Sequence, residues 1–306
     1  QAWQYLDPAL APKNPQGYDK SMREVCLQYF RNVDGYIKRL VELAGPDAQV
    51  FFASDHGFTA STEVLRINSF LEDLGYLKWA VNDGSEHAIR REASDFANLD
   101  WSKTTAYCRT PSSNGIHIRV ADKPGAPGIA PADYEKFRDK LIADLYTLKD
   151  PASGERIVKD VLKREEWFPG AHMKLACDLT LVLRDHGFVS IRNYKPALVK
   201  RPNPAGTHHP DGIFMACGKG IAASGMVDSR RIVDVCPTLL HSLGLPVPSD
   251  IEGEVPASFF SAEWLAAHPV KKGARTQKVG KREGTEMDEN EKKQMIEQLQ
   301  MLGYME

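Results

Sequence analysis

Cysteine is scarce in this sequence and occurs in no pattern typical of a disulfide framework or a zinc knuckle. The five cysteines run from Cys26 to Cys236, are widely spaced and odd in number, and include no Cys-x-x-Cys pair. This spacing argues against a small fold held together by disulfides or structural zinc. We expect most of these cysteines to be small core residues.

Long apolar runs and an excess of basic charge are also missing. No run approaches the ~18 apolar residues that a membrane span needs. The formal net charge is −2, so there is no basic surplus to neutralise the phosphates of a nucleic acid. Hydrophobic residues make up 42% and charged residues 26% of the chain, which indicates a globular protein. The chain does not open with methionine, which favours a fragment or processed product and leaves the compartment open.

The most informative stretch is 50–58, where an apolar β-type run ends in Asp55, His56 and Gly57. A buried strand that delivers metal ligands to the edge of a sheet has this pattern. A carboxylate and an imidazole are ligands that suit zinc, and the glycine allows a sharp turn after them. Taken alone, a two-residue Asp-His match favours a strand that merely ends in a polar turn.

A second segment, far downstream, favours the metal interpretation. Residues 206–212 form a glycine-led turn that carries His208 and His209, and an apolar strand follows at 213–216. Two loops that follow strands of one sheet can converge on a metal although they are distant in sequence. Residues 232–243 then predict an apolar helix, which Gly244 and Pro246 close.

The order of these motifs resembles the alkaline phosphatase superfamily, in its branch of type I phosphodiesterases and nucleotide pyrophosphatases. The resemblance rests on Ser-Asp-His-Gly-Phe (54–58), Gly-Thr-His with Asp-Gly-Ile-Phe (206–214), and Asp-Val-Cys-Pro-Thr-Leu-Leu (234–240) before Leu-Gly-Leu-Pro. The closing Leu-Gln-Met-Leu-Gly-Tyr (299–304) is similar to the end of many such sequences.

The resemblance implies two divalent ions, each with three protein ligands, and a Thr or Ser nucleophile. It assigns Asp55 and His56 to one ion and His208 to the other, with zinc preferred and manganese or iron as alternatives. Family members have an Asp-x-x-x-His element before a Tyr-Leu-Asp-Pro stretch, and this chain has that stretch at 5–8. The remaining ligands and the nucleophile are therefore expected upstream of Gln1, and the isolated chain is expected to bind metal weakly and turn over little or nothing.

Two other histidines compete for these ligand roles. His209 is the neighbour of His208, and the Gly-Thr-His spacing favours His208. His186 lies in a second Asp-His-Gly-Phe run at 185–188. The corresponding region in relatives is a strand that re-enters the core, so we interpret His186 as a polar loop residue.

The predicted fold class is α/β, with a doubly wound, mostly parallel sheet of alkaline-phosphatase type that an α+β cap insertion interrupts. Residues 1–60 and 196–262 are assigned to the metal-site core and 61–195 to the cap. Residues 263–306 are assigned to a flexible segment and a C-terminal helix. An amphipathic helix is expected over 20–44, with Cys26, Phe30, Val33, Ile37, Leu40 and Ala44 on a buried stripe.

The predicted function is hydrolysis of small phosphate esters by a two-metal phosphodiesterase or pyrophosphatase, of which this chain is the C-terminal part. No nucleic-acid surface and no membrane span are expected. One alternative is a non-catalytic metal-binding or interaction module. Others are a sulfatase, which needs a Cys-x-Pro-x-Arg context that Cys236-Pro237-Thr238 lacks, and a phosphomonoesterase or a phosphoglycerate mutase of the same superfamily.

Overall fold

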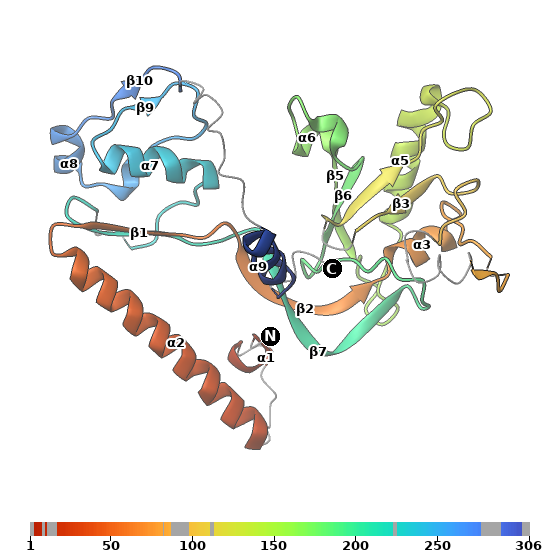
Figure 1. Cartoon of the computed structure of the whole chain (residues 1–306), viewed down its shortest axis with the longest axis horizontal. Coiled ribbons are helices and arrows are strands. Elements are labelled where there is room, and N and C mark those ends of the chain that lie inside the picture. The colour runs from red at the N-terminus through yellow and green to blue at the C-terminus, as the bar shows by residue number, and fades with distance from the viewer. Residues whose placement is uncertain are drawn as a thin grey trace. The chain divides into compact units, whose positions relative to one another are not determined.

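A computed structural model of the chain describes residues 3–7, 10, 17–81, 83–86, 98–110, 113–222, 225–276 and 289–301. The chain divides into two compact units, Gln1–Met215 and Ala216–Glu306. Both helices and strands occur along the chain, as the α/β prediction requires (Figure 1).

Most of the regular structure lies in the first unit. Its helices and strands are α1 (Trp3–Leu6), α2 (Gly17–Ala44), β1 (Gln49–Ala53), β2 (Gly57–Leu65), α3 (Ile67–Asp73), β3 (Ala106–Cys108), β4 (Gly115–Ile118), α5 (Tyr134–Leu145), β5 (Val158–Lys163), α6 (Arg164–Trp167), β6 (Leu179–Leu183) and β7 (Leu198–His209). The predicted helix over 20–44 and the predicted strand over 49–54 are confirmed by α2 and β1.

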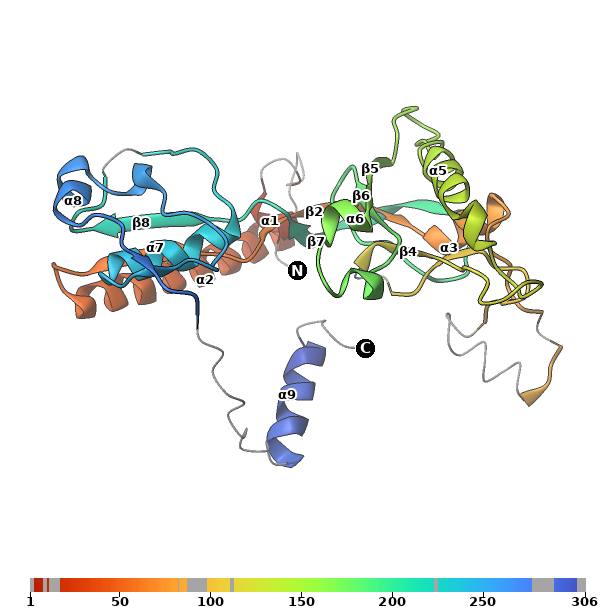
Figure 2. The same ribbon diagram turned by 90° about the horizontal axis from the view of Figure 1, so that it is seen from above.

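Two long strands, β2 and β7, form an antiparallel ribbon that runs through the first unit (Figures 1 and 2). The register pairs Phe58 with His208 at one end and Leu65 with Leu198 at the other. It shifts at a bulge between Ser61 and Glu63, both of which are buried. A bulge of this kind twists the ribbon locally and fixes its register.

The hydrophobic core lies around a four-stranded sheet with the order β3-β4-β6-β5. In β6, buried Leu179, Leu181 and Leu183 alternate with partly exposed residues, as expected for a strand with one face in the core. Leu141 and Leu145 are one helical turn apart on α5 and are both fully buried. This sheet falls inside 61–195, the range that the sequence assigns to a cap.

The predicted doubly wound, mostly parallel sheet is not confirmed. Where the register is described, β2–β7, β3–β4, β4–β6 and β5–β6 are all antiparallel, and only β9–β10 is parallel. A further two-stranded sheet joins β1 and β8 (Phe214–Gly218). The apolar pattern of a strand, and the succession of a helix and a strand, identify the elements but not the direction of the partner strand.

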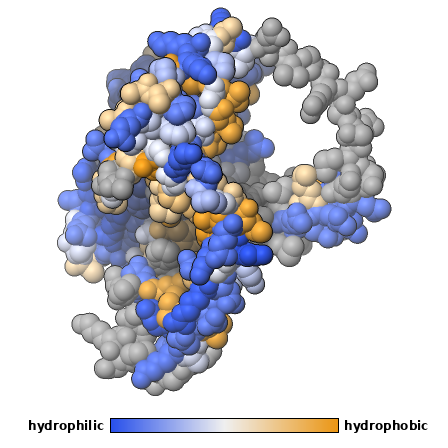
Figure 3. Space-filling model, turned by 90° about the vertical axis from the view of Figure 1, so that its left-hand side faces the viewer, coloured by the Kyte–Doolittle hydropathy of each residue, from blue (hydrophilic) through white to orange (hydrophobic). Residues whose placement is uncertain are grey.

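The surface of α2 differs from the predicted buried stripe. Cys26 is buried and Val33 and Ile37 are half-buried, whereas Phe30 is 52% and Leu40 66% exposed. Apolar patches of this kind interrupt the polar surface in Figure 3. None of the helices in the described ranges is long and apolar enough to cross a membrane.

The second unit contains short elements. After η4 (Ile232–Asp234) they are α7 (Val235–Ser242), β9 (Val247–Pro248), η5 (Ala257–Phe259), α8 (Ala262–Ala267), β10 (Lys272–Gly273) and α9 (Glu289–Met301). The predicted helices near 232–243 and at the C-terminus are thus found. Part of the predicted flexible segment, 277–288, lies outside the described residues, while 272–273 pair with 247–248.

All five cysteines are free, and two of them fit the prediction of core residues. Cys26 and Cys108 are buried, and burial raises the pKa of the Cys108 thiol to about 12, which makes it unreactive at neutral pH. Cys217 and Cys236 are exposed, so the prediction is wrong for them.

A cluster of charged side chains ties the β2–β7 ribbon to the sheet of the core. The Glu63 side chain on β2 is only 2% exposed and accepts hydrogen bonds from Arg184 (2.7 Å) and from Lys200 on β7 (2.8 Å). Asp150 accepts hydrogen bonds from the same two cations, each at 2.8 Å or less. Burial raises the pKa of Glu63, but the hydrogen bonds from Arg184 and Lys200 outweigh it and hold that pKa below its ordinary value.

We expect Glu63→Gln to lower the free energy of unfolding by about 3 kcal/mol, because Arg184 then loses one of its two buried anionic partners. Urea denaturation at pH 7 measures this loss. Since hydrogen bonds to the two cations hold the pKa of Glu63 and of Asp150 below their ordinary values, their stabilisation is present above pH ~4.5 and lost as the pH falls through the folded-state values.

The matched control is Glu24→Gln, which removes the same charge from the exposed Glu24–Arg31 pair on α2. An exposed pair contributes about 0–1 kcal/mol, so this variant should unfold almost as the wild type does. Equal losses from the two variants would contradict the role assigned to the buried cluster.

Candidate functional site

The β2–β7 pairing brings together the two segments that the sequence predicts to carry metal ligands. Phe58 and Gly57, which follow Asp55 and His56, are paired with His208 and His209. The two segments are therefore adjacent, but their local form differs from the prediction. His208 and His209 are the last two residues of strand β7, not members of a glycine-led turn.

The rings of His56 and His208 stack on each other. Their centroids are 3.9 Å apart and their planes differ by 23°. The Nδ1 atom of His56 lies 2.8 Å from the carbonyl oxygen of Gly57. A carbonyl can only accept, so Nδ1 carries the proton, and Nε2 keeps the lone pair that a metal or a proton can use.

Asp55 is the third of the predicted ligands and lies beside this pair. Its Oδ1 is 3.7 Å from Nε2 of His56, and its side chain is 82% exposed. The carboxylate is therefore next to the nitrogen with the lone pair and open to solvent, where it can reach an ion without a large desolvation cost.

Two phenylalanines surround the ring of His208. Phe188 meets it edge-on with centroids 5.5 Å apart, and Phe58 lies at 6.5 Å. Burial and the neighbouring His56 lower the pKa of His208, so its imidazole is neutral at pH 7. Neutral imidazole is the form that binds a metal.

His209 is engaged differently from His208. Its Nδ1 accepts a hydrogen bond from the backbone N–H of Asp211 (3.0 Å), and its ring contacts that of His186 with centroids 4.5 Å apart. Burial, with the neighbouring charges of His209 and Lys159, lowers the pKa of His186. The two competing histidines thus contact each other, while His56 and His208 form the other pair.

Asp185 was not among the predicted site residues. It holds the second Asp-His-Gly-Phe run against β2. Its Oδ2 accepts hydrogen bonds from Ser61 Oγ (3.0 Å) and from the backbone N–H of Thr62 (2.9 Å), and its Oδ1 accepts one from Gly187 N–H (2.9 Å). These bonds support His186 in the left-handed region, at φ +55°. The repetition of the tetrad was the signal that could have marked Asp185 and Phe188.

The donor set fits a zinc-type ion in its chemistry, because one carboxylate and two neutral imidazoles are its usual ligands. The ligand atoms do not converge, however. In the part of the chain that the structure describes, no three His, Cys, Asp or Glu side chains are grouped so that they could hold one metal ion. Asp55, His56 and His208 are therefore adjacent but do not form a complete three-ligand site.

The turn before β2 is packed closely against the chain that follows β7. A Cβ atom on Gly57 would lie 1.9 Å from the backbone oxygen of Asp211, and one on Gly212 would lie 2.5 Å from Ser54 Oγ. The backbone N–H of Ile213 also donates to Ser54 Oγ (2.7 Å). These contacts between 54–57 and 209–213 need glycine, and they hold the two histidine segments together.

The first unit combines helices and strands, and it brings Asp55, His56 and His208 next to one another. The family model for type I phosphodiesterases / nucleotide pyrophosphatases matches residues 11–211, about two thirds of the 306 residues. The chain belongs to this family. Comparisons with curated proteins and with solved structures give no significant match.

Membership supports a phosphate-ester hydrolase in general terms. The family acts on small phosphate esters and is generally metal-dependent. The matched range contains Asp55, His56 and His208 and ends two residues after β7.

We expect Gly57→Ala to lower the free energy of unfolding by about 2 kcal/mol, because the new methyl group would meet backbone and not a flexible side chain. Urea denaturation measures the loss. In a protein that also carries Phe58→Trp, tryptophan fluorescence would report whether residue 58 still lies opposite His208.

Gly35→Ala provides the matched control. Gly35 lies inside α2, and no heavy atom outside its own helix lies within 4 Å of the position of its Cβ. Alanine should stabilise that helix by about 0.5–1 kcal/mol. A Gly57→Ala variant as stable as Gly35→Ala would show that 54–57 and 209–213 are not held as described.

Proposed function

We propose that this chain supplies part of the catalytic centre of a divalent-metal-dependent phosphodiesterase or nucleotide pyrophosphatase. The observation that carries the proposal is the stacking of His56 on His208 beside Asp55, in a chain of a phosphate-ester hydrolase family. The two histidines are distant in sequence. The family motif and the pairing of β2 with β7 both point to these same residues.

The proposed ligand assignment has Asp55 and His56 on one ion and His208 on the other, with zinc preferred and manganese or iron as alternatives. Hydrogen bonding supports this choice of atoms, because the Gly57 carbonyl leaves Nε2 of His56 with its lone pair. It also supports His208 over His209, whose Nδ1 already accepts a hydrogen bond from the backbone of Asp211.

The side chains have separate parts in the proposed chemistry. Bound ions supply the charge that stabilises the in-line transition state of phosphoryl transfer. The carbonyl of Gly57 fixes the tautomer and the orientation of the His56 ring. Phe58 and Phe188 shield the ring of His208 from water, which keeps it neutral.

The assigned residues do not include a nucleophile, for which the family resemblance implies a Thr or Ser. We propose that residues 61–195 act as the cap that shapes substrate choice, between the core segments 1–60 and 196–262. This proposal is supported by the four-stranded sheet that lies within the range.

A second candidate function is a non-catalytic metal-binding module. It is favoured by the incomplete ligand grouping among the described residues. Both candidates predict zinc binding at the same side chains, and only the first predicts hydrolysis. With this ligand set we expect weak zinc binding and little turnover.

We expect His208→Ala to weaken zinc binding at least ~10-fold, because one of the proposed ligands is lost. His209→Ala is the matched control and should bind zinc as the wild type does. Competition with a chromophoric chelator measures both affinities. Equal zinc affinities for His208→Ala and wild type would overturn the ligand assignment. A second assay separates the enzyme from the binding module. An enzyme would hydrolyse bis(4-nitrophenyl) phosphate in a reaction that zinc stimulates and that His56→Ala abolishes.

A further inference from the structure

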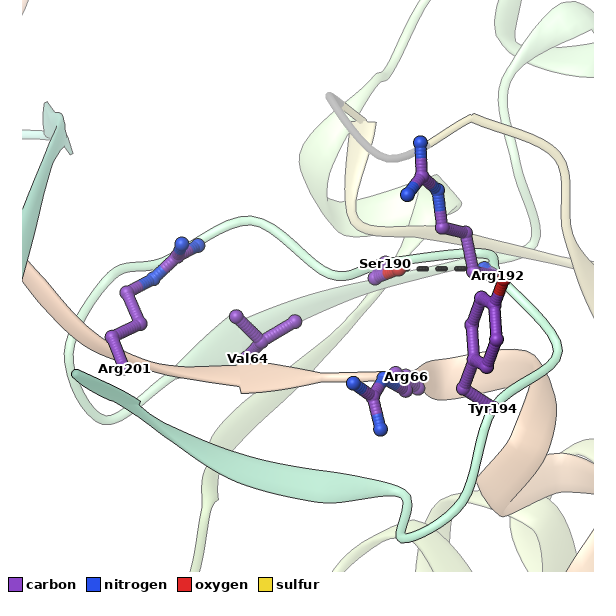
Figure 4. Close-up of a pocket in the computed structure, with 6 residues that line it drawn as sticks. All are labelled: Val64, Arg66, Ser190, Arg192, Tyr194 and Arg201. Atoms are coloured by element: carbon purple, nitrogen blue, oxygen red, sulfur yellow. Dashed lines mark hydrogen bonds between the residues drawn. The ribbon is translucent and has the colours of Figure 1, made fainter.

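The first unit contains a pocket of about 420 Å³ that none of the proposed metal ligands lines. It is lined by Val64, Arg66, Ser190, Arg192, Tyr194 and Arg201 (Figure 4). Its volume is within the range of small-molecule sites. Three of its six lining residues are arginines, so the pocket presents a concentrated positive charge.

Within the described ranges, the three arginines of this pocket have no anionic partner. Among the described residues, no carboxylate lies within ion-pair distance of Arg66, Arg192 or Arg201. Other arginines of the same unit are neutralised. Arg138 pairs with Glu165 at 2.8 Å, Arg164 with Asp178 at 3.0 Å, and Arg184 with Glu63 at 2.7 Å.

Neutral groups hold two of the arginines in place without cancelling their charge. One guanidinium nitrogen of Arg66 donates to the carbonyl of Pro196 (2.9 Å), and its carbon lies 5.6 Å from the centroid of the Tyr194 ring. The Nε of Arg201 donates to Ser61 Oγ (3.3 Å) and to the carbonyl of Glu63 (3.2 Å). Each guanidinium keeps further N–H groups for a ligand, since it has five donors.

Arg192 completes the pocket from an exposed loop. Its backbone N–H donates to Ser190 Oγ (3.3 Å), and both residues line the pocket. Figure 4 shows Arg201 at one end and Arg192 and Tyr194 at the other, with Val64 and Ser190 between them. This spacing suits an extended anion with several charges better than a single compact ion.

The pocket is lined by other residues than the histidine pair, and neither His56 nor His208 lines it. Phe58, at one end of β2, is opposite His208, and Arg66 directly follows the other end of β2, about 25 Å of extended strand away. Arg201 is nearer, because its Nε donates to Ser61 Oγ and Ser61 is three residues from Phe58.

We propose that this pocket is a second ligand site, which binds a small molecule that carries two or more phosphate groups. Guanidinium groups bind phosphate oxygens by paired charge-assisted hydrogen bonds, and the Ser190 hydroxyl adds a neutral donor. Tyr194 is a positioning residue, because its ring lies against the guanidinium of Arg66. The proposal does not depend on the assignment of metal ligands.

The test is calorimetric titration of the full chain with tripolyphosphate, in EDTA and at low ionic strength, so that no metal at the histidine pair contributes. We expect one binding site whose affinity falls as salt rises. Arg192→Ala should weaken binding at least ~10-fold, and Arg66→Ala with Arg192→Ala should abolish it. Arg192 donates no side-chain hydrogen bond to the described residues, so Arg192→Ala should fold normally, which circular dichroism checks.

Two control variants locate the bound anion. Arg39→Ala removes an exposed arginine from α2, and His208→Ala removes a histidine of the other site. Both should bind tripolyphosphate as the wild type does. The proposal is overturned if the wild type gives no binding, if Arg192→Ala binds equally well, or if His208→Ala weakens binding while Arg192→Ala does not.

Discussion

The pairing of β2 with β7 is the constraint on which the candidate site depends. It places Phe58 opposite His208, and a slip by one residue would turn every side chain of one strand to the other face. The bulge between Ser61 and Glu63 makes such a slip costly. Arg184 and Lys200 add to this cost, because both bind the buried carboxylate of Glu63 at the bulge.

Local patterns in the sequence predicted the helix α2 and the strand β1, but they did not predict this ribbon. The apolar periodicity of α5 and β6 is also visible in the residues themselves. Strand β7, in contrast, contains Pro202, Pro204 and Gly206, which favour a loop. The structure accommodates both prolines between the pairs Ser61–Ala205 and Glu63–Lys200, where the ladder is interrupted.

The candidate site was predictable in part, and the limit has a physical cause. The residue types and their order marked Asp55, His56 and His208, because a strand followed by Asp-His-Gly is a local feature. The side chains that distinguish His208 from His209 come from elsewhere in the chain, namely Phe188 beside the first and His186 beside the second. Such distinctions depend on tertiary contacts, which a motif does not contain.

The arginines of the first unit differ in what neutralises their charge. This difference distinguishes arginines that stabilise the fold from arginines that are available to bind a ligand. Arg184 is paired with buried carboxylates, so its charge is satisfied within the fold and stabilises the ribbon. Arg66, Arg192 and Arg201 line one pocket and repel one another, and the hydrogen bonds described for Arg66 and Arg201 go to neutral groups. Like charges gathered in this way oppose compactness unless an anion neutralises them. A phosphate-rich ligand would remove that cost. The first unit would then contain one charged cluster that its own carboxylates neutralise and a second that a bound ligand neutralises.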